Sequence, residues 1–198
     1  PNPYNTVSEM MQRNSLPFLL LIAAVSLGAM SMRESQSASV KLERITNDKL
    51  TAGEVVELTD EEINSFLHYE YAEEMPDGVR GVRVKFDKDI GVVTGTADFS
   101  KLSASSSGAS RFLLMMLRGE RPFEARVRYV ATNGEARVDV ESFKVSGREM
   151  KGMILDWAVN TYVAPNMEGF ELGRPTPLGH NLDSVRLDRG VATLTAAD

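Results

Sequence analysis

The chain has 198 residues, a formal net charge of −6 at neutral pH and no cysteine. The missing cysteine excludes disulfide bonds, a thiol nucleophile, a thiolate metal site, a lipoprotein anchor and covalent haem attachment. The negative charge argues against a general nucleic-acid binder, which shows a basic excess. The charge is uneven, because residues 41–77 are strongly acidic and residues 78–198 are slightly basic.

Residues 1–15 form a polar tail, and residues 16–32 contain no charged side chain. A bilayer core about 30 Å thick is crossed by roughly 17–25 apolar residues in a helix. A helix that is apolar on all faces belongs in a large core or a membrane. The pattern therefore predicts a membrane anchor over residues 16–32. Its most apolar side chains are Leu16, Phe18, Leu19, Leu20, Leu21, Ile22, Val25 and Leu27.

Three interpretations of this segment stay open: an uncleaved signal-anchor, which we favour, a cleaved secretory signal, and a helix buried in a soluble core. Arg13 supplies the basic start of a signal, and residues 37–39 supply small side chains for a cleavage site. The positive-inside rule decides nothing, because Arg13 and Arg33 lie on opposite sides. The long C-terminal part favours a domain on the extracytoplasmic (periplasmic) side of the cytoplasmic membrane.

Residues 33–52 are polar and predict a connector, either a tether or a first edge strand. Residues 53–198 predict one domain. A short strand over residues 54–58 precedes a capping box, in which Thr59 and Glu62 satisfy each other's backbone N–H groups. The helix that begins there is expected to end near Met75, before the turn at residues 76–78.

Three antiparallel hairpins follow, over residues 82–99, 123–140 and 182–195. Apolar and polar residues alternate along them, as a sheet with one buried face requires. The predicted inward side chains are Val82, Val84, Phe86, Val93, Gly95, Ala97, Phe99, Phe123, Ala125, Val127, Tyr129, Ala136, Val138 and Val140. Val92 is among the side chains that are predicted to point outward from the sheet. The Asn133-Gly134 pair predicts a tight turn, because both residues tolerate positive φ.

The segments between these hairpins predict two further helices. Residues 100–110 are rich in serine and predict a loop, whereas residues 112–117 predict a short apolar helix. Apolar side chains spaced by three and four over residues 148–163 predict an amphipathic helix, and residues 165–181 a loop. Helices that alternate with antiparallel strand pairs indicate an α+β fold, with a curved, meandering sheet and helices on its apolar face.

The sequence carries no phosphate-binding glycine loop and no nucleophile turn. Its two histidines, His68 and His180, stand apart from any set of three converging ligands, so we expect no metal site. The acids do not stand in apolar surroundings that would raise a carboxyl pKa for acid–base work. We therefore expect no catalytic residue, no cofactor and no enzymatic activity.

Two basic rows lie on the polar faces of predicted strands: Arg83 with Lys85, and Arg126 with Arg128. If these strands are neighbours, the rows form a small positive patch. Solvation of the sheet explains such a patch without any function. The functional interpretation is attraction to anionic lipid headgroups, with each cation contributing about 1 kcal/mol.

The motif at residues 58–64, LTDEEIN, resembles one in small, N-terminally anchored bacterial proteins related to tubular lipid-binding domains. Those proteins show Leu-Thr, acids and then Glu-Leu-Asn at a helix start, where this chain has Ile63 in place of leucine. The resemblance covers residues 54–195 in layout but only about seven residues as a motif, which a capping box alone explains. It implies an apolar groove for acyl chains. The residues expected to line it are Phe112, Met116, Met153 and Trp157.

Two functions follow from this reading. The first is a membrane-anchored extracytoplasmic domain that binds membrane lipid or another hydrophobic ligand. The second is a single-span accessory subunit of a larger membrane protein complex. Small residues in the apolar segment would let its helix approach a partner helix closely. They are Ala23, Ala24, Ser26, Gly28 and Ala29.

Overall fold

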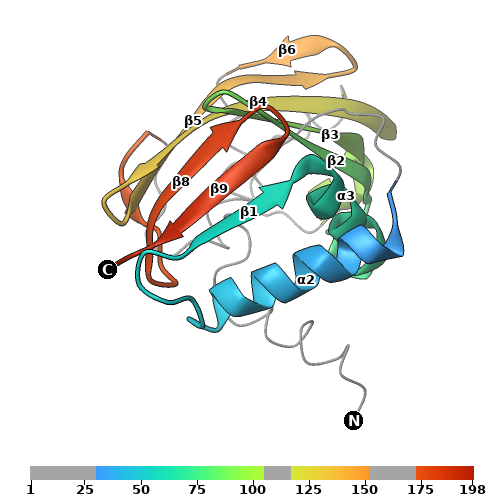
Figure 1. The fold of residues 1–198 in the computed structure, drawn as a ribbon. Helices are drawn as coiled ribbons and strands as arrows, with labels where there is room; N and C mark the ends of the chain where they lie inside the picture. The colour runs from blue at the N-terminus through green and yellow to red at the C-terminus, as the bar shows by residue number, and fades with distance from the viewer. Residues whose placement is uncertain (1–29, 105–116, 152–172) are drawn as a thin grey trace.

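A computed structural model describes residues 30–104, 117–151 and 173–198 (Figure 1). This part of the chain is a sheet-rich α+β fold with antiparallel strands, as predicted. Its elements are α2 (Met32–Thr46), β1 (Val55–Thr59), α3 (Asp60–Tyr69), the 3-10 helix η2 (Ala72–Glu74), β2 (Val79–Asp87), β3 (Ile90–Asp98), α4 (Phe99–Ala104), β4 (Glu120–Thr132), β5 (Glu135–Val145), β6 (Arg148–Met150), β7 (Thr176–Pro177), β8 (Leu182–Asp188) and β9 (Val191–Ala196).

The three predicted hairpins are β2–β3, β4–β5 and β8–β9. The sheet is nevertheless no simple meander, because its order is β1-β9-β8-β4-β3-β2, with β5 pairing beside β4. The first strand therefore lies next to the last, and α3 carries the chain from β1 to the opposite edge. Figure 1 shows β1, β9 and β8 as one set of adjacent strands, with α2 running below β1.

Strands β1, β9 and β8 form one set, and strands β4, β3 and β2 form the other. The two sets meet at a narrow joint. Only Ala131 of β4 pairs with Val185 of β8. Beside this pair, the β2–β3 turn enters the joint: the Asp89 N–H donates to the Leu187 carbonyl, and the Asp89 carbonyl accepts from the Tyr129 N–H. Asp89 can take this place because it adopts a left-handed conformation, with φ of 55°.

Most of the predicted inward side chains belong to the main core or pack against it, whereas Ala97, Phe99 and Phe123 belong to a second cluster. Val84, Phe86, Val127, Tyr129 and Val138 are all buried in the main core. The helices α2 and α3 pack on the same core through Ala38, Leu42, Ile45, Ile63, Phe66 and Leu67. Val92 departs from the prediction: although it lies on the outer face, it is only 8% exposed and packs with Ile90.

The edge of β2 is closed by side chains from α3. The Asn64 amide donates to the Val84 carbonyl and accepts from the Val84 N–H, so it imitates a neighbouring strand. The Asp60 carboxylate accepts from the Phe86 N–H at 2.7 Å. Because an exposed sheet edge is a template for unwanted strand pairing, these contacts protect β2 as well as fixing α3.

The predicted connector over residues 33–52 is wrong in its first part, because Met32–Thr46 form helix α2. The Ser31 side chain caps this helix by accepting from the Glu34 N–H, and Ala38, Leu42 and Ile45 recur at helical spacing on its buried face. The many serines conceal this pattern in the sequence. Met32, the last residue of the predicted anchor, therefore belongs to α2.

The predicted helix over residues 148–163 is also wrong at its start. Arg148–Met150 form strand β6, which turns back on β5 so that Arg148 lies opposite Val145. Ser146 and Gly147 make this reversal with φ of 51° and 75°. Residues 152–163 lie outside the described part of the chain. Helix α4, in turn, occupies residues 99–104, where the sequence predicts the beginning of a loop.

No helix within the described ranges is long and apolar enough to cross a membrane. The predicted anchor lies outside those ranges up to residue 29. Its side chains from Leu16 to Leu27, and the anchoring itself, therefore stay predictions.

Candidate functional site

The four residues predicted to line an apolar groove, Phe112, Met116, Met153 and Trp157, lie outside the described part of the chain. The described residues next to these segments show where they join the fold. Leu117 directly follows Met116 and is buried, and Met150 stands three residues before Met153 in partly buried surroundings. Both belong to one apolar cluster, which sequence reasoning did not identify as separate from the core.

This second apolar cluster lies at the end of the sheet where β3 runs into α4 and β5 turns into β6. Its buried members are Ala97, Phe99, Leu117 and Val145. Its partly exposed members are Val79, Phe123, Phe143 and Met150. The rings of Phe123 and Phe143 have centroids 6.5 Å apart. Its aromatic and methionine side chains form an adaptable apolar surface.

Gly95 gives Phe123 its place in the second apolar cluster. Gly95 lies opposite Phe123 across the β3–β4 pair, and a Cβ atom at residue 95 would lie 2.9 Å from two carbons of the Phe123 ring. The ring therefore packs on the bare backbone of β3. The absence of a side chain at residue 95 positions the aromatic pair.

We expect the Gly95→Val substitution to destabilise the domain by about 1–3 kcal/mol, the typical effect of overpacking. The valine side chain would displace the Phe123 ring and open the second apolar cluster. Urea denaturation followed by circular dichroism measures this change. Thr96→Val is the control, because it places the same side chain on β3 but on the face away from Phe123. Equal effects of the two substitutions would contradict the proposed packing.

A concavity, which we call the sheet groove, lies over the joint between β8 and β4 and has a volume of about 540 Å³. Its wall is mixed: Val55 and Val130 are 56% and 50% exposed, and they alternate with hydroxyl and charged side chains. The polar lining residues are Glu57, Asp89, Ser184, Arg186, Thr193 and Thr195. Tyr129 also lines it, but burial raises the pKa of its phenol well above the ordinary value, so the phenol remains protonated.

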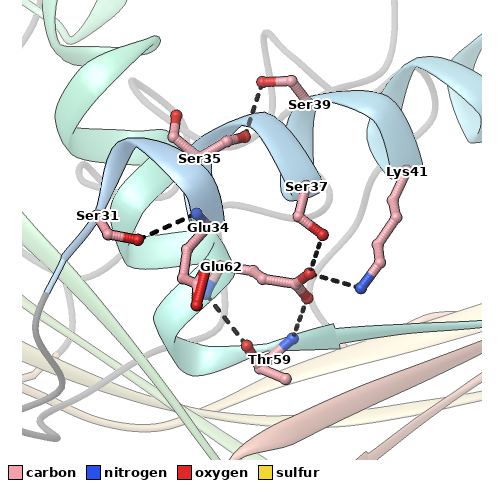
Figure 2. A network of polar contacts seen from close by, with 8 residues as sticks. All are labelled: Ser31, Glu34, Ser35, Ser37, Ser39, Lys41, Thr59 and Glu62. Carbon is pink, nitrogen blue, oxygen red and sulfur yellow. Dashed lines mark hydrogen bonds and ion pairs between the residues drawn. The ribbon is translucent and has the colours of Figure 1, made fainter.

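Glu62 is a buried acid at the centre of a polar network, and it is 7% exposed (Figure 2). Its carboxylate accepts from Lys41 Nζ at 2.6 Å, from Ser37 Oγ, and from the Thr59 N–H at 3.0 Å. The Thr59 hydroxyl accepts from the Glu62 N–H in return, which confirms the predicted capping box. Glu62 thus joins α2, α3 and the end of β1.

Burial alone would raise the pKa of the Glu62 carboxyl. Hydrogen bonds from Lys41, Ser37 and the Thr59 backbone outweigh that effect, so the pKa is lowered on balance. The carboxylate is therefore ionised at neutral pH, with three donors around it. Such a group holds elements together rather than exchanging protons with a substrate.

The two histidines take no part in a described cluster of chemical groups. His68 is exposed and meets the edge of the Tyr69 ring, with centroids 4.7 Å apart. His180 Nδ1 lies 3.6 Å from the Asp48 carboxylate. Over residues 30–104, 117–151 and 173–198, no three His, Asp or Glu side chains stand close enough to hold a metal ion.

The strands that carry the two basic rows, β2 and β4, are not neighbours, so the condition for a continuous patch is not met. Strand β3 lies between β2 and β4, so Lys85 and Arg126 stand on either side of Val92. Arg83 lies opposite Thr94 and Arg128 opposite Ile90, one step from Val92 in opposite directions along β3.

Comparison of the chain with protein-family models, with curated proteins and with solved structures gives no match.

Proposed function

We propose that this protein is a non-enzymatic domain, anchored in the cytoplasmic membrane by the apolar segment that begins at Leu16 and ends before Ser31, that binds lipid or another hydrophobic ligand on the extracytoplasmic side. The observation that supports it is the second apolar cluster. Its aromatic and methionine members, Phe123, Phe143 and Met150, are only partly buried. The chain leaves this cluster at both Leu117 and Lys151 into segments that carry the four predicted lining residues.

The ligand class follows from the chemistry of the cluster. Its members are aromatic, aliphatic and thioether side chains. Burying apolar area contributes roughly 25 cal/mol per Å², so a hydrocarbon chain laid on two phenylalanine rings gains substantial affinity. The sheet groove is a poorer site for a lipid tail, because hydroxyl and charged groups make up much of its wall.

The junction at Ser31 supports an anchor close to the folded domain. Ser31 caps α2, and its backbone N–H donates to Ser65 Oγ of α3 at 3.1 Å. The apolar segment is therefore followed by a fixed point of the fold rather than by a long linker. A domain tied in this way would stay near the surface of the membrane in which its anchor is embedded.

The ligand can be tested with the full-length protein in vesicles that contain a photoactivatable phospholipid. We expect cross-links to the acyl chain on peptides from β4, β5 and β6. The Phe143→Ser substitution should reduce them by about tenfold, since it removes most of one phenylalanine's burial energy. Val130→Ser is the matched control, because Val130 lies on the outer face of the sheet. It should leave the cross-links unchanged. Cross-links confined to other peptides would contradict the proposed site.

The second candidate function is an accessory subunit of a larger membrane protein complex. The observation that favours it is the sheet groove, where Val55 and Val130 are both about half exposed. Exposed aliphatic side chains rimmed by polar groups are typical of protein–protein contacts. Under this proposal Val130→Ser, rather than Phe143→Ser, would release the chain from its complex during gentle extraction of the membrane.

A further inference from the structure

We propose that the outer face of β2, β3 and β4 binds the anionic headgroups of membrane phospholipids through Arg83, Lys85 and Arg126, which we call the basic face. The inference rests on the proposed function, because an anchored domain must lie against its membrane. It adds the surface that does so and the lipid chemistry that it selects.

The strand register places the three cations around one point. Lys85 of β2 and Arg126 of β4 both lie opposite Val92 of β3, and Arg83 lies opposite the next outward residue, Thr94. Adjacent strands stand about 4.8 Å apart, so Lys85 and Arg126 are separated by roughly two such spacings. A phosphate group that settles over β3 can therefore approach cations from both sides.

Two apolar side chains stand among these cations. Ile90 and Val92 form a cluster of their own on the outer face and are only 7% and 8% exposed. Long basic side chains commonly cover such residues with their methylene stems while their charged ends stay in water. Packing on these buried side chains would hold the stems of the basic residues on the outer face while their charged ends reach headgroup phosphates.

The acidic residues on this face do not neutralise the three cations of the basic face. Within the described ranges, no acid forms an ion pair with Arg83, Lys85 or Arg126. The neighbouring acids have other cationic partners. These pairs are Glu124 with Lys144, Glu141 with Arg128, Asp139 with Arg137, and Asp87 with Arg189.

The absence of cysteine gives a direct experiment. Thr94→Cys, carrying a fluorophore that shifts to the blue in apolar surroundings, would report contact between the basic face and lipid. In nanodiscs with phosphatidylglycerol we expect a blue shift that disappears at high salt. In nanodiscs of phosphatidylcholine alone we expect the emission of a label in water. Three cations near an anionic surface strengthen the contact on the order of 100-fold.

The triple substitution Arg83→Gln, Lys85→Gln and Arg126→Gln should abolish the shift. The matched control changes three exposed arginines elsewhere, Arg121, Arg148 and Arg174, to glutamine and should retain it. Equal losses in the two triples would show an effect of net charge alone and overturn the inference. So would a shift of the same size without phosphatidylglycerol.

A second label separates this inference from the proposed function. Val25→Cys lies within the predicted anchor and should report hydrocarbon. If that label is in hydrocarbon and the label at residue 94 stays in water with both lipids, the basic face is overturned and the anchor stands. If the label at residue 25 is in water, the anchor is wrong, and the inference that rests on it falls too.

Discussion

Replacing Asn64 by leucine should destabilise the domain by about 4 kcal/mol. The Asn64 side chain is 5% exposed and satisfies both backbone groups of Val84 on the edge of β2. It also donates to the Asp60 carbonyl at 2.7 Å. Leucine has similar size but no polar atom, so two buried backbone groups would lose their partner, at about 1–3 kcal/mol each. Urea denaturation monitored by circular dichroism would measure the loss.

Asn47→Leu is the control for this substitution. The Asn47 side chain donates to the Glu43 carbonyl at the end of α2, at 2.8 Å and in partly buried surroundings. Its replacement should cost less than about 1 kcal/mol, since water can take over the bond. If Asn64→Leu costs no more than Asn47→Leu, the closed edge of β2 does not contribute to stability in the way that the structure suggests.

Replacing Glu62 by glutamine should cost about 2–3 kcal/mol at neutral pH, because hydrogen bonds to a charged group are worth more than neutral ones. Lys41 would also lose its ion pair. The effect should depend on pH. The pKa of Glu62 is lowered in the folded protein from the ordinary value of 4.5, so its ionised form stabilises the fold fully above that value. This stabilisation is lost as the pH falls through the lowered pKa.

Denaturation at neutral pH and at several values below 4.5 would test this dependence. The wild type and Glu62→Gln should differ most at neutral pH and converge in acid. Glu54→Gln is the control: Thr51 and Arg44 lower the pKa of Glu54 as well, but Glu54 lies at the surface. It should change stability less than Glu62→Gln. A difference between wild type and Glu62→Gln that stays constant at every pH would contradict the role of the Glu62 charge.

The sequence predicts elements well where local chemistry decides them. Thr59 and Glu62 identify a helix start because the two groups that pair are three residues apart in the chain. The Asn133-Gly134 turn follows from conformations that few other residues accept, and both residues have the expected positive φ. The inward faces of the hairpins follow from strict alternation, since a strand shows its neighbours to opposite sides.

The prediction fails where distant contacts decide. Helix α2 depends on its packing against α3 and on the bond from Ser31 to Ser65, neither of which a run of serines reveals. Strand β6 forms because Ser146 and Gly147 reverse the chain onto β5. The joint of β4 with β8 depends on one pair of residues far apart in the chain. Local periodicity contains no information about such pairings.

The candidate site is only partly contained in the sequence. Alternation correctly places Phe123 on an inward face, but it does not show that the sheet there carries a second apolar cluster apart from the main core. The ring of Phe143 joins it through a change of register between Arg126 and Val127 on β4, which shifts the alternation of β5. The two basic rows are visible in the sequence. The sequence does not show that β3 lies between the two strands that carry them.

Native mass spectrometry of the full-length protein, gently extracted from its own membrane in mild detergent, tests the proposed function most directly. The proposal predicts a chain that retains residues 16–32 and carries lipid-sized adducts, which Phe143→Ser loses and Val130→Ser keeps. A large stoichiometric assembly without adducts on this chain would contradict it and favour the accessory subunit.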